Sequence, residues 1–413
     1  MIELVAAHGY NAVSVAALSK RAHVSKRDFY KHFASKEECF LAAYDLIVSN
    51  ALRGIHAAGE GEDEWRERLR LGFLAFAGQV AHSPETARLA LVEVFAAGAG
   101  AVERMLRTNQ LFEVLLAKNL ALDGSPGLPP LVVKGIVAGC ARVARARLLS
   151  AYPRQLVLDG DELMEWALSF CDDDVVRLRG LGAAGPPLPV AAAEMPLGTL
   201  PPGDERALIL AATAKLASNE GYAALTVPRI RALAGVSKRS FDAHFDGAAD
   251  CFLATLKLLS GRTLAAAEPF YLTADDWASG VHRMIARLCR HLAGDPAFAG
   301  LAFLEVFSPG HEAVRWRSEM IAKLAAMLRR EAPPAQRPTV FAAEASIGAM
   351  WGVVHHFVAT GRGAQLPAAA PVLSYLALAP ALGGAAAVDA IVAEAGGAGD
   401  AEVGGHVDRN LIA

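Results

Sequence analysis

Apolar residues recur every three or four positions through most of the chain, which is the spacing of amphipathic helices. No segment shows the alternation of a convincing strand. The helices expected between residues 36 and 179 span 36–54, 65–81, 84–97, 102–122, 130–151 and 161–179. Proline and glycine fall between them, where helices tend to end. The pattern therefore predicts an all-α fold.

Two short helices near the start of the chain carry a more specific signal. Phe29 and Phe33 are four residues apart, so they share one face of the second helix and point into a small core. Ser25 can cap this helix, and Asp28 can complete a capping box. Two short helices joined by about three or four residues, with basic and aromatic groups outside the second, form a helix-turn-helix pattern.

The outer face of the second helix is suited to a charged partner. Lys26, Arg27 and Tyr30 lie off its apolar face. The next helix repeats the capping pattern and carries Lys36 in its first turn, where free backbone N–H groups favour a phosphate. Between residues 19 and 36, six basic residues stand against one acid, a net charge of +5, although the whole chain carries −3. This distribution favours double-stranded DNA as the partner.

These residues also carry a resemblance to a known family. The sequence resembles the TetR-type transcriptional regulators over its first fifty or so residues, through Gly9-Tyr10, Ser14-Val15, Ala22-His23-Val24-Ser25, Phe29-Tyr30, His32-Phe33 and Ser35-Lys36-Glu37. The resemblance implies that Tyr30 and Lys36 bind phosphates, and that His32 either packs between helices or contacts DNA. It also implies a helical body that binds a small-molecule effector and dimerises through its last two helices.

The motif occurs twice, at an offset of 212 residues. Segments 9–45 and 221–257 share 16 identities in 37 positions without a gap. The offset persists into the body, where Glu93-Val94-Phe95 matches Glu305-Val306-Phe307. A match in both head and body indicates that a whole unit was duplicated. The recurring Glu93 and Glu305 are expected to serve helix packing or a salt link.

The second copy departs from the pattern of the first. Asp242 replaces Tyr30, and Ala248 replaces Lys36. Residues 231–248 carry three basic groups and two acids, a net charge of +1. Each lost phosphate contact weakens the salt-dependent part of the affinity. We therefore expect the first head to bind DNA strongly, and the second to bind it weakly or at a different sequence.

The repeat predicts a division of the chain. The expected parts are a head (1–54), a body (55–180), a Pro/Gly-rich linker (181–203), a degenerate second head (204–264), a second body (265–384) and a Gly/Ala-rich tail (385–413). The tail is expected to hold at most a short helix near 385–394. The second unit's first helix begins near Asp204, whereas Met1 aligns with Thr213, so about nine residues of the first copy's opening helix are absent. A start codon assigned too far downstream is our hypothesis for this difference.

Composition narrows the class of protein. A chain with 54% hydrophobic and 20% charged residues is globular, and five cysteines without close pairs suggest reduced thiols in the cytoplasm. Segment 363–388 has no charge, but prolines and a Gly-Gly pair interrupt it, so we expect no membrane insertion. His355 and His356 diverge by about 100° on a helix, which argues against joint metal ligation. No cofactor is expected, and no catalytic motif indicates an enzyme.

The sequence therefore predicts a DNA-binding transcriptional regulator, a repressor that a small molecule releases. The candidate DNA-binding residues are Ser14, Ser25, Lys26, Arg27, Phe29, Tyr30, His32, Lys36, Ser237, Lys238, Arg239 and His244. The candidate pocket residues are Trp65, Phe73, Phe76, Phe95, Trp277, Phe303, Phe307 and Trp351. Two alternatives stay open: an intramolecular pseudo-dimer or a homodimer with four heads, and a protein-interaction or ligand-sensing module whose second head, or both, no longer bind DNA.

Overall fold

The computed structural model describes residues 1–120, 127–150, 159–171, 177–178, 204–307 and 311–404, and they form helices without a strand. The expected linker, 181–203, lies outside these ranges, as do residues 172–176 of the helix expected over 161–179. The predicted all-α fold is confirmed.

The first unit is a small head joined to a helical body. The head contains α1 (Ile2–His8), η1 (Tyr10–Ala12), α2 (Val15–Arg21) and α3 (Lys26–His32), and α4 (Lys36–Ala58) runs from it into the body. The body contains α5 (Trp65–His82), α6 (Pro84–Leu91), η2 (Glu93–Phe95), α7 (Ala99–Leu120), α8 (Pro130–Leu149) and α10 (Gly160–Leu168). The single helix expected over 84–97 is thus split into α6 and a 3₁₀ turn.

The second unit repeats this order. Its head contains α12 (Glu205–Glu220), η3 (Tyr222–Ala224), α13 (Val227–Ala234) and α14 (Lys238–His244), and α15 (Ala248–Leu272) leads into the body. The body contains α16 (Trp277–Gly294), α17 (Pro296–Phe303), η4 (Glu305–Phe307), α18 (His311–Arg330), η5 (Pro334–Gln336), α19 (Val340–Ala359), η6 (Gly363–Gln365) and α20 (Leu366–Leu382). The equivalent ring pairs Tyr10–Phe40 and Tyr222–Phe252 both meet edge to face at 5.1 Å. The two units are therefore built alike.

The expected boundaries at 54 and 264 both fall inside long helices. Since α4 and α15 are continuous from head to body, each head is attached to its body by a rigid element. The first helices differ in length, because α12 has 16 residues and α1 has seven. Asp204 caps α12 by accepting a hydrogen bond from the Arg206 N–H.

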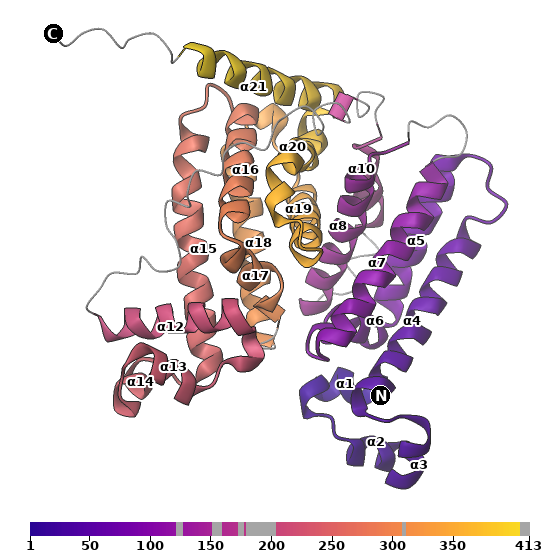
Figure 1. The fold of residues 1–413 in the computed structure, drawn as a ribbon. Helices are drawn as coiled ribbons and strands as arrows, with labels where there is room; N and C mark the ends of the chain where they lie inside the picture. The colour runs from indigo at the N-terminus through magenta and orange to yellow at the C-terminus, as the bar shows by residue number, and fades with distance from the viewer. Residues whose placement is uncertain (121–126, 151–158, 172–176, 179–203, 308–310, 405–413) are drawn as a thin grey trace.

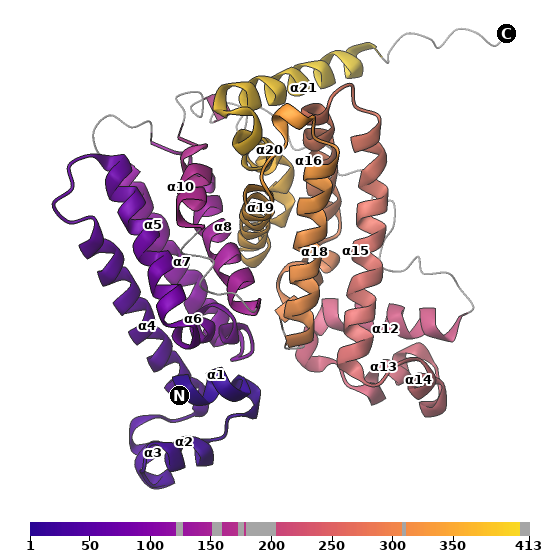
Figure 2. The same cartoon turned by 180° about the vertical axis from the view of Figure 1, so that it is seen from behind.

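The two bodies pack through α8 and α19, which lie side by side in the middle of the molecule (Figures 1 and 2). A Cβ added at Gly348 would come within 2.5 Å of the Arg142 side chain, and one added at Gly352 within 2.2 Å of Ala138. At an offset of 210 residues, Gly348 corresponds to Ala138 and Gly352 to Arg142. Each glycine of α19 therefore contacts the counterpart of the other, as in a two-fold pair of helices. Glycine permits the close approach because it has no side chain there.

Other contacts between the units involve α10 and α20. The Trp166 indole N–H donates to Ser346 Oγ at 3.1 Å, and the Tyr375 hydroxyl donates to the Phe170 carbonyl at 3.3 Å. A Cβ added at Gly135 would meet Leu376 at 2.7 Å. The interface is thus a packed core with a few satisfied polar groups.

The apolar segment near the end of the chain is part of the second body. By length and composition Gly363–Leu382 could cross a bilayer, but 61% of the window tested is buried inside the protein. The helix starts at Leu366, and Pro367 lies in its first turn, where a missing N–H costs nothing. Such burial fits a core helix.

The tail differs from expectation. Helix α21 (Gly384–Gly404) extends well beyond the short helix expected near 385–394. Ala387, Val388 and Ile391 are fully buried, and Glu394 accepts hydrogen bonds from Arg283 of α16 at 2.7 and 3.0 Å. The first half of this segment therefore packs on the second body (Figure 1).

Candidate nucleic-acid interface and the cavity behind it

The outer helix of the first head is set by two local caps. Ser14 Oγ accepts the Ala17 N–H at 3.1 Å at the start of α2. Ser25 Oγ accepts the Asp28 N–H at 3.0 Å at the start of α3, and its hydroxyl donates to Asp28 Oδ2 at 2.7 Å. The two serines proposed as DNA contacts are therefore N-caps that remain exposed.

The turn between α2 and α3 contains a left-handed residue. His23 has φ 56°, and Gly235 has φ 69° at the equivalent position of the second head. Glycine adopts this conformation without steric cost, whereas an L side chain does so at a cost of about 1–2 kcal/mol. The first head therefore carries backbone strain that the second lacks.

The exposed face of α3 carries four of the predicted residues. Lys26, Arg27 and His32 are exposed, and Tyr30 is 56% exposed. Within the described residues Lys26 and Arg27 have no ion-pair partner. Phe29, also predicted as a DNA contact, is only 7% exposed and packs against Phe33 with ring centres 5.5 Å apart. Phe29 therefore supports the outer face from below.

Ion pairs reduce the net charge that the sequence count assigns to this head. Lys31 Nζ is 2.7 Å from Asp28 Oδ1, and Arg21 is 2.6 Å from Glu3, which lies outside the segment counted. Both pairs are exposed, so their contribution to stability is small. The positive charge left for a partner is concentrated on Lys20, Lys26 and Arg27.

Lys36 is less available than expected. It is half-buried, its Nζ donates to the Tyr10 carbonyl at 3.1 Å, and the same atom lies 4.0 Å from the centre of the Tyr10 ring. Burial lowers the pKa of this lysine. A phosphate contact would use the remaining donors of an ammonium group that is already held in place.

Tyr10 also connects the head to the body. Its N–H donates to Glu93 Oε2 at 2.9 Å, and Glu93 is completely buried in η2 with Arg88 at 3.4 Å. A structural role was expected for Glu93, and this contact supports it. The backbone of Tyr10 therefore joins a body carboxylate on one side to Lys36 on the other.

The second head has a different electrostatic surface. Lys238 Nζ is held by Asp242 Oδ2 at 2.7 Å, at the position where the first head has Tyr30. The Ser240 hydroxyl donates to Glu205 Oε2 at 2.6 Å, so a second carboxylate lies beside α14. Ser237 caps α14, and Arg239 and His244 are exposed. The net charge around α14 is therefore smaller than the +1 counted over residues 231–248, because that count did not include Glu205.

The two heads lie at the same end of the molecule, with α3 and α14 outermost (Figures 1 and 2). A family model described as "Bacterial regulatory proteins, tetR family" matches residues 2–43 and 209–255, which are the two heads. Both heads therefore belong to the TetR family. The chain contains two TetR-like units in tandem.

One curated relative of this TetR-family chain is the HTH-type transcriptional activator FasR of Mycolicibacterium smegmatis. The two are 34% identical over 87 residues, which cover 21% of this chain and 40% of the relative. The match therefore spans about two fifths of the length of that protein.

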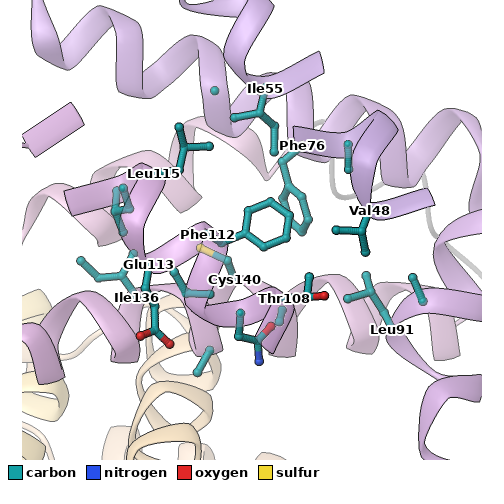
Figure 3. A pocket seen from close by; sticks show the side chains of 18 of the residues that line it. Val48, Ile55, Phe76, Leu91, Thr108, Phe112, Glu113, Leu115, Ile136 and Cys140 are labelled. Carbon is teal, nitrogen blue, oxygen red and sulfur yellow. The ribbon is translucent and has the colours of Figure 1, made fainter. Parts of the chain in front are cut away.

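The first body of the TetR-like pair encloses a cavity of about 1010 Å³. Figure 3 shows apolar side chains such as Val48, Ile55, Phe76, Phe112 and Ile136 surrounding one space. Helices α4 to α8 and the turn at 59–63 supply most of the lining, and α18 and α19 of the second unit also contribute. The volume is at the upper end of the ~300–1,000 Å³ of pockets for drug-sized ligands.

Some of the aromatic residues predicted to line pockets lie in a cavity wall, and others do not. The cavity in the first body is lined by Phe73, Phe76, Phe95 and Trp351. Phe303 and Trp351 line a cavity of about 170 Å³ in the second body. Trp65 and Trp277 line neither, because Trp65 lies under the Arg66 guanidinium and the Trp277 indole N–H donates to the Leu328 carbonyl. The Phe307 side chain lies outside the described residues.

Sequence reasoning missed the polar wall of the larger cavity. Arg145 of α8 is buried, its Nε donates to the Leu91 carbonyl at 2.7 Å, and its guanidinium lies 4.7 Å from the Phe95 ring centre. Arg317 of α18 is equally buried and lies 5.0 Å from the Trp351 ring centre. The sequence carried no signal for this wall, because Arg145 lies between Arg142 and Arg147 and Arg317 follows Arg315, and helix periodicity alone does not assign one arginine among several to a site.

Burial changes the titration of these groups. Desolvation and the nearby Arg142 lower the pKa of Arg145 to about 9, and desolvation with Arg145 lowers the pKa of Arg317 well below its usual range. His355 also lines the cavity, and burial together with Arg317 lowers its pKa to about 4. Within the part of the chain that the structure describes, no group of three or more His, Cys, Asp or Glu side chains could hold a metal ion.

Proposed function

We propose that the chain is a sequence-specific transcriptional regulator that binds double-stranded DNA chiefly through its first head. The observation that carries this proposal is the exposed face of α3, where Lys26, Arg27 and Tyr30 stand on a capped helix. A helix presented in this way fits the major groove, and basic side chains beside it contact bases or phosphates. The proposal also keeps the division into heads, bodies and tail expected from the repeat.

We further propose that the two units act as an intramolecular pseudo-dimer. Two heads must reach successive major grooves about 34–36 Å apart, and here both heads lie at one end of the same chain (Figure 1). The exchanged contacts of Gly348 with Arg142 and of Gly352 with Ala138 are those of a two-fold interface, in which each patch meets its own counterpart. Because the heads differ, the DNA site would be an imperfect palindrome.

A small-molecule effector would act through the cavity of the first body. Helix α4 lines this cavity from Tyr44 to His56 and joins the first head at its N-terminal end. An effector that displaces α4 would change the spacing of the heads and lower the affinity for DNA. We propose a repressor that is relieved in this way; the relative is named an activator, so a promoter fusion assayed with and without the protein decides the sign.

The experiment that tests the proposal is selection of bound sequences from random duplex DNA, followed by affinity measurements at two salt concentrations. A regulator should select two unequal half-sites and lose affinity steeply as salt rises. The native mass of the complex separates one chain per site from a homodimer with four heads. The rival function is a protein-interaction or ligand-sensing module, and it predicts no selected sequence and no salt-dependent binding.

A further inference from the structure

Two groups of Tyr10 hold the side chain of Lys36. The Lys36 Nζ donates to the Tyr10 carbonyl at 3.1 Å and lies 4.0 Å from the centre of the Tyr10 ring. An ammonium group over the face of an aromatic ring is attracted by the negative charge of that face. The carbonyl and the ring of one residue therefore keep the same ammonium group in one place.

The positive charge of Lys36 stays available to a partner. Within the part of the chain that the structure describes, Lys36 forms no ion pair, and the two acids that follow it in α4 are engaged elsewhere. Glu38 accepts a backbone N–H that lies just before α4, and Glu37 Oε1 lies 2.7 Å from a Cβ placed at Gly100, in the first turn of α7. An ammonium group has three donors, and the Tyr10 carbonyl uses one of them. The others are free for an anion from outside.

Tyr10 is itself fixed by the protein. Its N–H donates to Oε2 of the buried Glu93 at 2.9 Å, and its ring meets Phe40 edge to face with the centres 5.1 Å apart. Because the Tyr10 side chain is only 7% exposed, it can restrict the lysine without moving itself. A side chain that is held before it binds loses less conformational freedom on binding.

The second head keeps the tyrosine but lacks the lysine. Tyr222 meets Phe252 with the same distance of 5.1 Å between ring centres. Helix α15 begins with Ala248, at the position where α4 begins with Lys36. The second head therefore offers a tyrosine in the same packing, without an ammonium group beside it.

We propose that Tyr10 is a positioning residue that holds Lys36 for contact with one phosphate of the DNA backbone. Phosphate contacts fix the register and orientation of a protein on the duplex, so a lysine held in one place fixes them better than a mobile one. This inference rests on the proposed function, because it adds to the first head a residue that acts on DNA through another side chain.

The first test changes the electrons of the ring and keeps its shape. Tyr10→Phe retains the aromatic face, and trifluorophenylalanine at the same position retains the shape while it weakens the attraction for a cation. The probe is a short duplex of mixed sequence at low salt, because phosphate contacts do not depend on sequence. We expect Tyr10→Phe to bind like the wild type, and the fluorinated ring to weaken binding by about threefold to tenfold. Equal affinities for the two rings would overturn the proposal.

A double-mutant cycle separates positioning from packing. Lys36→Met should reduce the slope of log affinity against log salt by about 1, and Tyr10→Leu should reduce it by most of that amount. In the Lys36→Met background, Tyr10→Leu should have no further effect. Tyr222→Leu is the matched control, because it removes the equivalent ring from the second head, and it should leave the slope unchanged. A loss from Tyr10→Leu that is the same with and without Lys36 would assign the ring to packing alone and refute the proposal.

A measurement without DNA keeps this inference apart from the proposed function. In protein with lysine isotope-labelled at the ε carbon, the Lys36 resonance is the one that disappears in Lys36→Met. The ring current of Tyr10 should shift this resonance in the wild type and in Tyr10→Phe, and the shift should be lost in Tyr10→Leu. An unchanged resonance in Tyr10→Leu would refute the positioning even in a protein that binds DNA. Failure to bind any duplex, with the shift intact, would refute the proposed function instead.

Discussion

The inequality of the two heads gives the sharpest test of the proposed function. The perturbations are Arg27→Ala in the first head and Arg239→Ala in the second. Both arginines are exposed at the same position of their outer helices. If the heads were equivalent, the two variants would lose equal amounts of affinity for a selected site.

The structure predicts unequal losses. In the first head Arg27 acts beside Tyr30 and Lys26, and a single base or phosphate contact is worth about 1–3 kcal/mol, so Arg27→Ala should weaken binding by about tenfold to a hundredfold. In the second head Asp242 occupies the place of Tyr30 and holds Lys238 at 2.7 Å, so α14 lacks these anchors. Arg239→Ala should therefore weaken binding by less than about threefold.

The assay is fluorescence anisotropy with a labelled duplex from the selection, at several salt concentrations between about 50 and 200 mM. Lys118→Ala is the control, because it removes one exposed charge from the last turn of α7, far along the body from the head. Asp242→Tyr should raise affinity, since it releases Lys238 and restores the tyrosine of the first head. Equal losses for Arg27→Ala and Arg239→Ala would refute the reasoning.

Three further predictions concern stability. Glu93→Ala leaves the buried Tyr10 N–H without its acceptor and should lower the free energy of unfolding by about 1–3 kcal/mol in denaturant titrations, whereas Glu103→Ala on the exposed face of α7 should leave it unchanged. His23→Gly should raise the melting temperature, because glycine adopts φ 56° without strain, by an amount equivalent to at most about 1 kcal/mol; a lower melting temperature would speak against strain at this turn. His355 has a folded pKa of about 4, below the ~6.5 of the unfolded chain, so the unfolded chain takes up a proton first and stability should fall as pH drops from about 6.5 to 4, by up to about 1.4 kcal/mol per pH unit. The same titration of His355→Gln should show a shallower slope, and an unchanged slope would count against this histidine.

Much of the architecture follows from local patterns in the sequence. Helix periodicity, the caps at Ser25 and Ser237, and the 212-residue repeat identify two heads and two bodies, because they depend on residues close together in the chain. The unequal charge of the heads was also visible, since Asp242 replaces Tyr30 directly. The ion pair between Arg21 and Glu3 was not visible in the sequence, because the charge count over residues 19–36 did not include the preceding helix.

The cavity illustrates where sequence reasoning ends. Aromatic residues at helical spacing were reasonable candidates, yet Trp65 and Trp277 pack elsewhere while Arg145 and Arg317 line the wall. Arg317 lies 172 residues after Arg145, and helix periodicity carries no information about contacts at such separations.

The sequence by itself determined that the fold is all-α, that the unit is duplicated, and that Lys26, Arg27 and Tyr30 face outward on α3. The tertiary structure alone decided that Lys36 is held by Tyr10, that Glu93 ties the head to the body, and that one cavity draws arginines from both units. The physical reason is that helix formation and capping depend on neighbours within about one turn. The environment of a buried charge depends instead on how whole helices pack, which for this chain is set by the close approach of α8 and α19 at their glycines.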